Sequence, residues 1–283
     1  MVKTIYELYE KCFPGVIRAK EHVEFLMGRP DNYIIKKEAE GRLIGVSMIH
    51  KNNVFLLCVA PEFQRRGIGS QLLQESEDYI VKAGYDEICF CDGDDYITPG
   101  IPLYEGNREF FEKRGYEHTW GDSECVDMQQ DLDKFDFSEF AGGDCINDVT
   151  YRWALDADLP AVIDNVESAH PEFVPYYKET WHHQENDDSK VLLAICDGKV
   201  CGTLMVDCET EAPGVGSVGC TATRKEYQGR GIATTMVKIG TRYLKERGLP
   251  KAYLGYTYTA IVPMYGRSGY QISMKYFMGK KRI

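Results

Sequence analysis

The stretch YQGRGIATTMVKIG, residues 227–240, decides the fold. It places Gly229, Gly231 and Ala233 at the front of a helical pattern, although glycine is among the poorest helix formers. A strand that ends in such a turn and then enters a helix points several backbone N–H groups at one place, and the helix dipole there favours an anion. Small residues also let a phosphate approach the backbone closely. The stretch therefore predicts a strand–turn–helix unit that holds a phosphate group.

A second copy of this stretch lies earlier in the chain. One segment begins FQRRGIG at Phe63 and the other begins YQGRGIA at Tyr227, so that Gly67 aligns with Gly231 without a gap. The likeness extends to a later pair of segments, FFEKRGYE and PMYGRSGYQ, which both end a helical pattern with Gly and Tyr. Self-similarity of this kind indicates two copies of one fold.

Both halves show the same order of predicted elements: helices, a hairpin, a strand, the glycine turn, a helix, a strand, a helix and a strand. Apolar extended runs precede the two turns at 53–60 and 215–223. We therefore expect an α/β fold with two tandem domains, each a twisted mixed sheet flanked by helices. The acidic, aperiodic stretch 133–148 is the expected linker between an N-terminal domain, 1–132, and a C-terminal domain, 149–283.

Composition excludes several classes of protein. The chain has 283 residues, 43% of them hydrophobic, and a formal net charge of −11. An acidic chain is a poor nucleic-acid binder, because phosphate neutralisation needs clustered Lys and Arg. No apolar run reaches the roughly 20 residues of a membrane span, and the N-terminus has no signal-peptide pattern. Ten cysteines without a CxxC pair indicate free thiols, most of them buried, and a cytoplasmic protein.

The two turns resemble the signature of the GNAT superfamily of acyl-CoA-dependent N-acetyltransferases, Gln/Arg-x-x-Gly-x-Gly/Ala. Here the signature reads QRRGIG at 64–69 and QGRGIA at 228–233. The resemblance implies a tandem GNAT protein whose turn amides hold the pyrophosphate of acetyl-CoA, the cosubstrate, without a metal. It also implies that the preceding strand pairs with the pantetheine arm. The cofactor-binding residues implied for the second domain are Cys220, Thr221, Ala222, Thr223, Gln228, Gly229, Arg230, Gly231, Ile232 and Ala233.

The same resemblance implies a tyrosine that gives a proton to the leaving thiolate. The second half has Tyr265 in YGRSGY, whereas the first half has Phe111 in FEKRGY. A phenyl ring cannot donate a proton, so we assign catalysis to the second domain with Tyr265 as the general acid. The first domain, which has Asn107 at a position that contacts the coenzyme in many relatives, is expected to be non-catalytic or to help form a substrate cleft.

The general base is less specified, because the strand before the second turn carries no acidic residue. Asp207, at the end of the preceding strand, is the leading candidate. The alternatives are a water chain and the side chains of Glu209, Glu211, His170, His182 and His183. The adjacent histidines 182 and 183 cannot chelate a metal from one helical face, so we expect no metal site.

The segment CDGDDYITPGIPLYEGNREFF, 91–111, suggests the acceptor. Its acidic residues Asp92, Asp94, Asp95 and Glu105 flank Pro99-Gly100-Ile101-Pro102, which is similar to an element of tandem GNAT proteins that act on glucosamine and related amino sugars. We expect the partner to be a small-molecule primary amine, such as glucosamine or a glucosaminide. A protein or peptide N-acetyltransferase and a non-catalytic acyl-CoA-binding regulatory protein remain alternatives, and both a monomer and a homodimer are compatible with the sequence.

Overall fold

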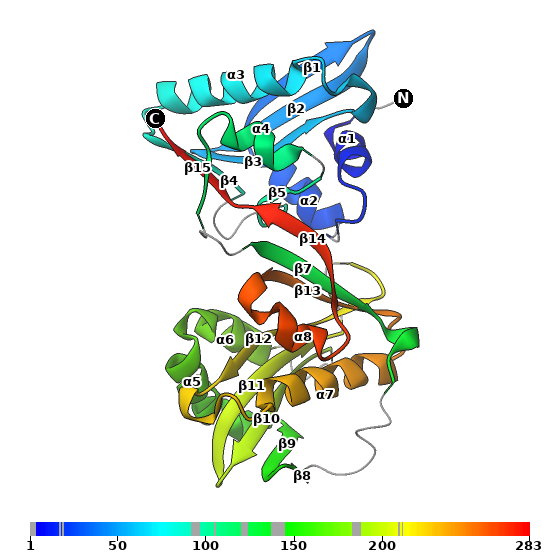
Figure 1. Ribbon diagram of the computed structural model, residues 1–283, viewed down its shortest axis with the longest axis vertical. Helices are drawn as coiled ribbons and strands as arrows, with labels where there is room; N and C mark the ends of the chain where they lie inside the picture. The colour runs from blue at the N-terminus through cyan, green and yellow to red at the C-terminus, as the bar shows by residue number, and fades with distance from the viewer. Residues whose placement is uncertain are drawn as a thin grey trace. The chain divides into compact units, whose positions relative to one another are not determined.

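The chain forms two compact units in a computed structural model (Figure 1). Unit 1 comprises Met1–Val126 and Ser273–Ile283, and unit 2 comprises Asp127–Ile272. The structure describes residues 4–16, 18, 20–91, 97–104, 106–119, 124–136, 145–182, 188–208, 210 and 212–283. Both units have the expected α/β architecture, a sheet of mixed strands with helices packed on it.

Unit 1 has a six-stranded sheet in the order β1-β2-β3-β4-β15-β6. Neighbouring strands are antiparallel except β3 and β4, which are parallel. A short extra pair is made by β5 and the unit 1 part of β14 (Gln271–Phe277). The other elements of the unit are α1 (Ile5–Cys12), α2 (Lys20–Met27), β1 (Tyr33–Ala39), β2 (Arg42–His50), β3 (Asn53–Val59), α3 (Ile68–Lys82), β4 (Glu87–Phe90), β5 (Ile101–Pro102), α4 (Asn107–Glu112), β6 (Glu117–His118) and β15 (Gly279–Arg282).

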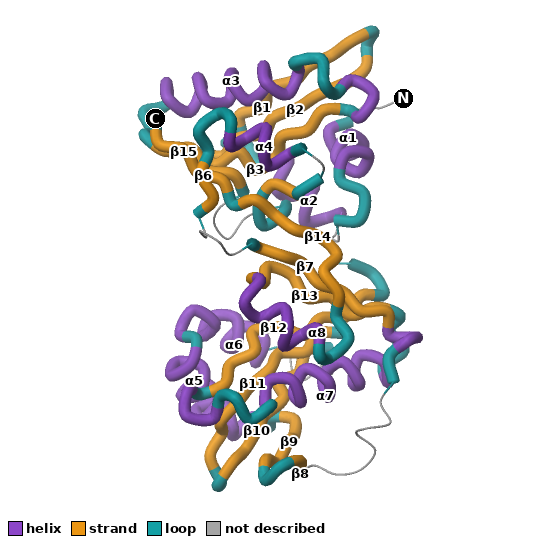
Figure 2. Tube along the Cα trace, viewed as in Figure 1, coloured by secondary structure: helices purple, strands orange, loops and turns teal. Residues whose placement is uncertain are grey.

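Unit 2 repeats this plan with the strand order β7-β13-β12-β11-β10-β9-β8. Here β12 and β13 are the parallel pair. Helices cover both faces of the sheet, α5 and α6 on one side and α7 and α8 on the other (Figure 2). Its elements are β7 (Cys125–Asp131), β8 (Cys145–Ile146), β9 (Val149–Trp153), α5 (Leu159–Ala169), α6 (Val174–Trp181), β10 (Ser189–Cys196), β11 (Lys199–Asp207), β12 (Val215–Thr223), α7 (Ile232–Glu246), β13 (Lys251–Tyr258) and α8 (Val262–Gly266).

The long helix after each glycine turn packs tightly on its own sheet because the strand beneath it carries a glycine. A Cβ at Gly45 in β2 would lie 3.0 Å from Leu72 of α3. A Cβ at Gly202 in β11 would lie 2.9 Å from Met236 of α7. Since contacts this short are rarely tolerated between side chains in a packed core, both glycines fix the helix against the sheet. The same packing device therefore occurs in both units.

The unit boundaries differ from the division expected at 1–132 and 149–283. The C-terminal segment Ser273–Ile283 belongs to unit 1, where β15 pairs with β4 and β6. Conversely, β7 falls within the expected domain 1–132, but most of this strand belongs to unit 2, where it lies next to β13. The sequence predicted one final strand for each half, without its bounds, and could not say which sheet that strand joins. Of the expected linker 133–148, residues 137–144 lie outside the described part of the chain.

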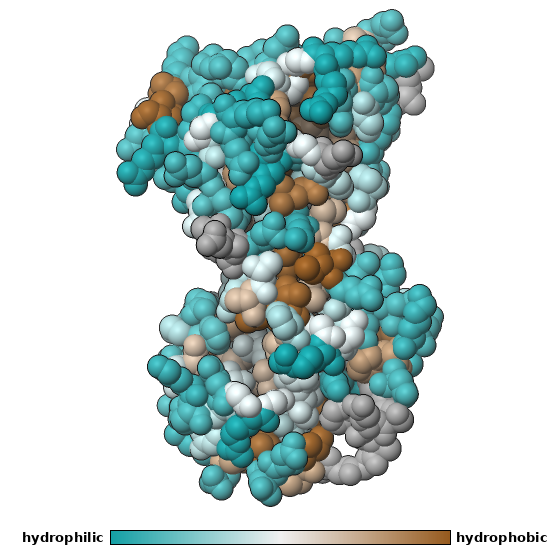
Figure 3. All heavy atoms as spheres, viewed as in Figure 1, coloured by the Kyte–Doolittle hydropathy of each residue, from teal (hydrophilic) through white to brown (hydrophobic). Residues whose placement is uncertain are grey.

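The surface and the thiols complete this description. Residues on the visible face of each unit are mostly hydrophilic (Figure 3). All ten cysteines are free, most of them buried or half-buried, as the sequence indicates. Among the described residues, no helix is long and apolar enough to cross a membrane.

Candidate active site

Both glycine turns have the geometry of an anion site. Gly231 has a φ of 79° directly before α7, and Gly67 has a φ of 84° directly before α3. No side chain caps either helix, so the N–H groups of its first turn are left for an outside partner. A Cβ at either glycine would meet no atom within 4 Å, so the space in front of each turn is open. A phosphate group can therefore approach either backbone.

A glutamine anchors each turn to the strand before it. In unit 2, Gln228 Nε2 donates to the carbonyl oxygen of Thr223 at 3.0 Å. In unit 1, Gln64 Nε2 donates to the carbonyl oxygen of Val59 at the same distance. Each bond joins the start of the turn to the last residue of its strand. The glutamine of the signature is thus a structural residue of the turn in both units.

The two parallel strands of each unit part from one another near the turn. In unit 2, β12 and β13 pair only from Val215 to Ser217, on the β12 side. In unit 1, β3 and β4 pair only at Asn53 and Val54. Within the described residues, the rest of β12, 218–223, has no strand partner on that side. The exposed backbone edge can pair with an extended ligand as an added strand would.

A β-bulge interrupts β12 where it parts from β13. The register against β11 shifts between Thr203 and Met205, and Cys220 adopts a positive φ of 46°. The hydroxyl of Tyr177, which is fully buried, donates to the carbonyl oxygen of Cys220 at 2.7 Å and holds the bulge. Tyr177 was not among the residues predicted from the sequence, because nothing in its helix pattern separates it from an ordinary core aromatic.

Tyr265 meets β12 next to this bulge. Only 3% of the residue is exposed, and its hydroxyl lies 3.1 Å from the hydroxyl of Thr221. Burial raises the pKa of Tyr265 to about 12, so the phenol keeps its proton at neutral pH. The structure therefore brings together two of the residues predicted for the site, a protonated buried phenol and a threonine on the unpaired edge of β12.

Asp207 lies further along the sheet. Asp207, on β11, lies opposite Ser217 on β12. Ser217 comes four residues before Thr221, and four residues of extended strand span roughly 13 Å. Its carboxylate accepts from the hydroxyl of Ser217 at 3.4 Å, and burial raises its pKa. The structure does not bring Asp207 into contact with Tyr265, although its charge acts on the thiol of Cys220. A direct proton transfer between the two side chains is therefore not built into this unit.

The other candidate bases are dispersed. His170 forms a hydrogen bond with Glu172, with 3.1 Å between Nδ1 and Oε1, and its ring stacks on Phe173. His182 ends α6. His183, Glu209 and Glu211 lie outside the described residues. Nowhere in the described part of the chain do three or more His, Cys, Asp or Glu side chains gather in a way that could hold a metal ion.

A cavity of about 500 Å³ opens in front of the unit 2 turn. Its walls come from the turn, the first residues of α7 and the end of α8. Lys238 and Arg267 place two cationic side chains in its lining, a setting that suits phosphate groups. Neither residue belongs to the glycine signature, so the motif does not predict them; only the likeness of α8 to the first half points to Arg267.

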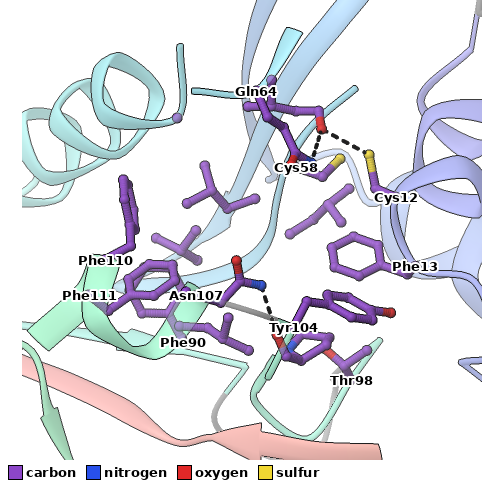
Figure 4. Close-up of a pocket in the computed structure, with 18 of the residues that line it drawn as sticks. Cys12, Phe13, Cys58, Gln64, Phe90, Thr98, Tyr104, Asn107, Phe110 and Phe111 are labelled. Atoms are coloured by element: carbon purple, nitrogen blue, oxygen red, sulfur yellow. Dashed lines mark hydrogen bonds between the residues drawn. The ribbon is translucent and has the colours of Figure 1, made fainter. Parts of the chain in front are cut away.

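Unit 1 has a larger cavity of about 810 Å³, between α1, the unpaired edge of β3, the Gly67 turn and α4 (Figure 4). Phe111, the counterpart of Tyr265, lines it, and the Phe111 ring packs 4.8 Å from that of Phe90. Asn107 Nδ2 donates to the carbonyl oxygen of Pro102 at 3.0 Å. The cavity therefore has an anion turn and an open strand edge, but a phenyl ring where unit 2 has its phenol.

The segment that suggested an amino-sugar acceptor has a packing role in unit 1. A Cβ at Gly100 would lie 2.9 Å from both the Met278 sulfur and the Phe277 carbonyl oxygen, so only glycine fits there. Ile101 and Pro102 form β5 against β14. The acidic residues Asp92, Asp94, Asp95 and Glu105 lie outside the described part of the chain.

An anion turn beside two parting parallel strands is the arrangement of a protein that holds a long, phosphate-bearing ligand in extended form. The sequence profile of the acetyltransferase (GNAT) family matches residues 2–116 and 152–270, and the chain belongs to this family. Acetyl-CoA is the acyl donor that the family generally uses. No curated protein sequence matches the chain.

Solved structures show the same tandem fold. A GCN5-related N-acetyltransferase from Sphaerobacter thermophilus is 19% identical with a TM-score of 0.73, covering 98% of this chain and 91% of that one. The glucosamine N-acetyltransferase region of a fungal multi-domain β-N-acetylglucosaminidase is 18% identical with a TM-score of 0.71; the match covers 98% of this chain but only 36% of that one. A tandem GNAT protein from the clavulanic acid pathway is 14% identical with a TM-score of 0.62, covering 100% and 97%.

Proposed function

We propose that the protein transfers the acetyl group of acetyl-CoA to the primary amine of a small molecule, and that unit 2 carries out the chemistry. The observation that carries this proposal is the contact between Tyr265 and Thr221 at the point where β12 and β13 part. A thioester lying along the open edge of β12 has its sulfur near a buried phenol that keeps its proton. That phenol donates to the coenzyme A thiolate as the tetrahedral intermediate collapses.

The remaining predicted residues orient the cosubstrate. The N–H groups around Gly229 and Gly231 hold the pyrophosphate, with Lys238 and Arg267 adding positive charge at the same cavity. The backbone from Cys220 to Thr223 pairs with the pantetheine arm. In this arrangement the bulge at Cys220, held by Tyr177, positions the thioester carbonyl relative to Tyr265. Binding energy from the distant phosphates is thereby used to place the reacting atoms.

Asp207 remains the proposed base. Its carboxyl is half-buried, its pKa is raised, and its charge acts on the thiol of Cys220 at the bulge. An acceptor amine that binds between the bulge and Asp207 would pass its proton to this carboxylate through a bound water, since the side chain does not reach Tyr265. A raised pKa brings a carboxylate closer to the value that suits a base at neutral pH.

Amino sugars are the acceptors to try first. The related fungal region is named as a glucosamine N-acetyltransferase, and the net charge of −11 suits a cationic amine. The test is release of coenzyme A thiol from acetyl-CoA with amino sugars, aminoglycosides, polyamines and peptides as acceptors. Turnover with amino sugars would support the proposal, and turnover with peptides alone would replace it with a peptide N-acetyltransferase. Binding of acetyl-CoA without turnover on any amine would indicate a non-catalytic acyl-CoA-binding protein.

A further inference from the structure

Two thiols and two phenols gather at one end of the unit 1 cavity. Cys12, the last residue of α1, and Cys58, on β3, both line it, and their sulfur atoms lie near one another (Figure 4). Tyr9, one helical turn before Cys12, and Tyr104, from the loop after β5, line the same cavity. None of these four residues belongs to the glycine signature, and the proposed chemistry of unit 2 does not use them.

The two thiols differ in reactivity. Cys58 is fully buried and its S–H group donates a hydrogen bond to the Cys12 sulfur. The pKa of Cys58 is raised well above its ordinary value. That hydrogen bond, aided by the positive charge of Lys11, lowers the pKa of Cys12 despite partial burial. Cys12 is also the more accessible of the two. A half-exposed thiol that ionises more easily than usual is the nucleophile of such a pair.

The surroundings tolerate loss of the Cys12 proton. The Cys12 thiol donates to the carbonyl oxygen of Val59 at 3.3 Å. That oxygen also accepts from Gln64 Nε2 at 3.0 Å, so it keeps a partner when the thiol is ionised. Ionisation of Cys12 therefore leaves no buried backbone group without a hydrogen bond at this place.

Two tyrosine hydroxyls near Cys12 make no hydrogen bond within the described part of the chain. Tyr9 is 5% exposed, and neither its hydroxyl nor the buried hydroxyl of Tyr104 has a partner among the described residues. Tyr104 lies close enough for the charge of Cys12 to raise its pKa, and burial raises the pKa of both phenols. A buried unpaired hydroxyl is costly, which indicates a ligand that accepts from it. The carbonyl oxygen of a thioester is such an acceptor.

We infer that unit 1 binds acyl-CoA and that Cys12 takes the acyl group as an S-acyl thioester. This inference rests on the proposed use of acyl-CoA by the protein. The Cys12 sulfur attacks the thioester carbonyl, Tyr9 and Tyr104 donate to the oxygen that becomes negative, and the carbon–sulfur bond to coenzyme A breaks. The coenzyme A thiolate takes the proton that Cys12 lost. One thioester replaces another, so no oxidant or reductant is needed, and excess acyl-CoA favours the acylated protein.

Unit 2 has a thiol at its own bulge, but it is not suited to this reaction. Burial and the negative charges of Asp207 and Glu172 raise the pKa of Cys220 to about 12. Cys220 therefore stays a neutral thiol beside the proposed catalytic tyrosine. S-acylation is expected in unit 1 alone, where the phenol counterpart is missing and a reactive thiol is present.

The test uses the full-length protein with acetyl-CoA, without an amine acceptor, and with a phosphine reductant because thiol reductants would cleave the adduct. Intact mass spectrometry should show a mass increase of one acetyl group, which neutral hydroxylamine removes, and peptide mapping should place it on Cys12. Cys12→Ala should abolish the adduct, whereas Cys145→Ala, which removes an exposed thiol of unit 2, should leave it unchanged.

Two further variants test the chemistry of the site. Cys58→Ala removes the hydrogen bond that lowers the pKa of Cys12, so this pKa should rise and acetylation should slow by up to about tenfold for each pKa unit gained. Tyr104→Phe keeps the ring and removes one donor, with an expected slowing of about 10²-fold. Circular dichroism and calorimetric binding of acetyl-CoA confirm that each variant is folded.

The outcomes separate this inference from the proposed function. If the protein binds acetyl-CoA and acetylates an amine but never gains a hydroxylamine-labile acetyl group, the inference is overturned and the proposed function stands. An acetyl group found equally on Cys145, or one that persists in folded Cys12→Ala, overturns it as well. A labile adduct on Cys12 with no turnover on any amine supports the inference and removes the proposed function.

Discussion

The same place in the two units holds a threonine–tyrosine pair in one and a leucine–phenylalanine pair in the other. Seven residues before the signature glutamine, unit 2 has Thr221 and unit 1 has Leu57; on the helix before the last glycine, unit 2 has Tyr265 and unit 1 has Phe111. In unit 2 the two hydroxyls are 3.1 Å apart. In unit 1, Leu57 packs against the apolar core that includes Phe111. One fold thus places two hydroxyl groups together in one copy and apolar side chains in the other.

The glycine turn and the buried tyrosine hydroxyl are therefore separate features of the fold, because unit 1 has the first without the second. Both turns have left-handed glycines, open space in front and a glutamine anchor. Only one turn is paired with a phenol suited to protonate a leaving thiolate, while the other opens into the larger cavity. We therefore expect that binding of the cosubstrate and acetylation of an amine can be altered one unit at a time.

The largest expected effect comes from closing the turns. Gly231→Glu places a carboxylate where the pyrophosphate is proposed to lie, so acetyl-CoA binding by unit 2 and amine acetylation should both be lost. Gly67→Glu should remove binding by unit 1 and affect turnover much less. Calorimetry of each variant, together with rates of coenzyme A release, measures both effects.

The control for these variants is alanine at the same positions. Both glycines have positive φ, so any side chain adds backbone strain, but alanine adds neither charge nor bulk in a space with no atom within 4 Å. Gly231→Ala should therefore bind acetyl-CoA far better than Gly231→Glu. If calorimetry of a folded Gly231→Glu protein shows no loss of an acetyl-CoA site, or if this variant keeps full activity, the choice of unit 2 as the active unit is overturned.

The next effect concerns Tyr265. Tyr265→Phe keeps the ring but removes the proton donor, and we expect kcat to fall about 10²–10⁴-fold with little change in acetyl-CoA affinity. A fall in kcat with a modest change in substrate KM is the signature of an interaction made in the transition state. Steady-state kinetics with the best acceptor amine measures both constants.

Tyr270 offers a matched control on the same stretch of chain. Tyr270 is also 3% exposed, and its hydroxyl lies 3.0 Å from the hydroxyl of Thr241, a buried residue of α7. Tyr270→Phe removes an equally buried phenol hydroxyl and should lower the thermal midpoint without the loss in kcat. If the two variants lose activity equally, the tyrosine at 265 serves packing. Activity gained by Phe111→Tyr in a protein whose unit 2 turn has been closed would reverse the comparison between the units.

The sequence predicted the parts of this fold that carry a motif. The repeat at Gly67 and Gly231 predicted two α/β copies, and the turns, their helices and the contrast between Tyr265 and Phe111 all come from short-range patterns. Backbone geometry at a glycine turn is specified locally, because few residues accept positive φ. The tandem architecture is therefore confirmed, whereas the roles of the site residues stay predictions.

The remaining features depend on contacts that no local pattern records. The sequence predicts one final strand for each half, but the pairing of β15 with β4 and of β7 with β13 is decided by the sheet edge that each strand reaches. The bulge at Cys220, held by a hydroxyl 43 residues earlier in the chain, has no sequence signature. Asp207 was predicted as the base because it lies near β12 in the sequence. In the fold it lies opposite Ser217, which is four residues before Thr221 on β12. Long-range packing therefore limits what sequence alone can place.

The next, smaller effect is the pH dependence of kcat/KM, which tests whether Asp207 is the general base. If Asp207 is the base, it must be ionised, so kcat/KM should rise with pH through its raised pKa. Asp207→Asn should flatten that acidic limb and lower the rate about 10²-fold at neutral pH. The closest control is Asp188→Asn, an acidic residue near the start of the neighbouring strand with a partly exposed side chain. An acidic limb that survives in Asp207→Asn would assign the base elsewhere.

Asp207→Asn should lower the rate at neutral pH, but its effect on stability should become more favourable as pH rises. Because the folded pKa of Asp207 lies above its unfolded value, folding favours the protonated carboxyl, and this stability is lost as pH rises through the folded pKa. Asparagine does not ionise. The thermal midpoint of Asp207→Asn relative to wild type should therefore become more favourable as pH rises from below the ordinary carboxyl range to neutrality. A difference that does not change with pH would mean that the carboxyl keeps its ordinary pKa.

The smallest expected effect comes from removing only the hydroxyl group that contacts Tyr265. Thr221→Val keeps the branched shape and takes away the hydroxyl 3.1 Å from Tyr265, making unit 2 resemble unit 1 at one atom. Tyr265 keeps its proton but loses orientation, so kcat should fall several-fold, well short of the loss in Tyr265→Phe. The two changes should not add: once the phenol is gone, Thr221→Val should cost nothing more in kcat. Additive losses in this double-mutant cycle would show that Thr221 acts on the substrate directly rather than through Tyr265.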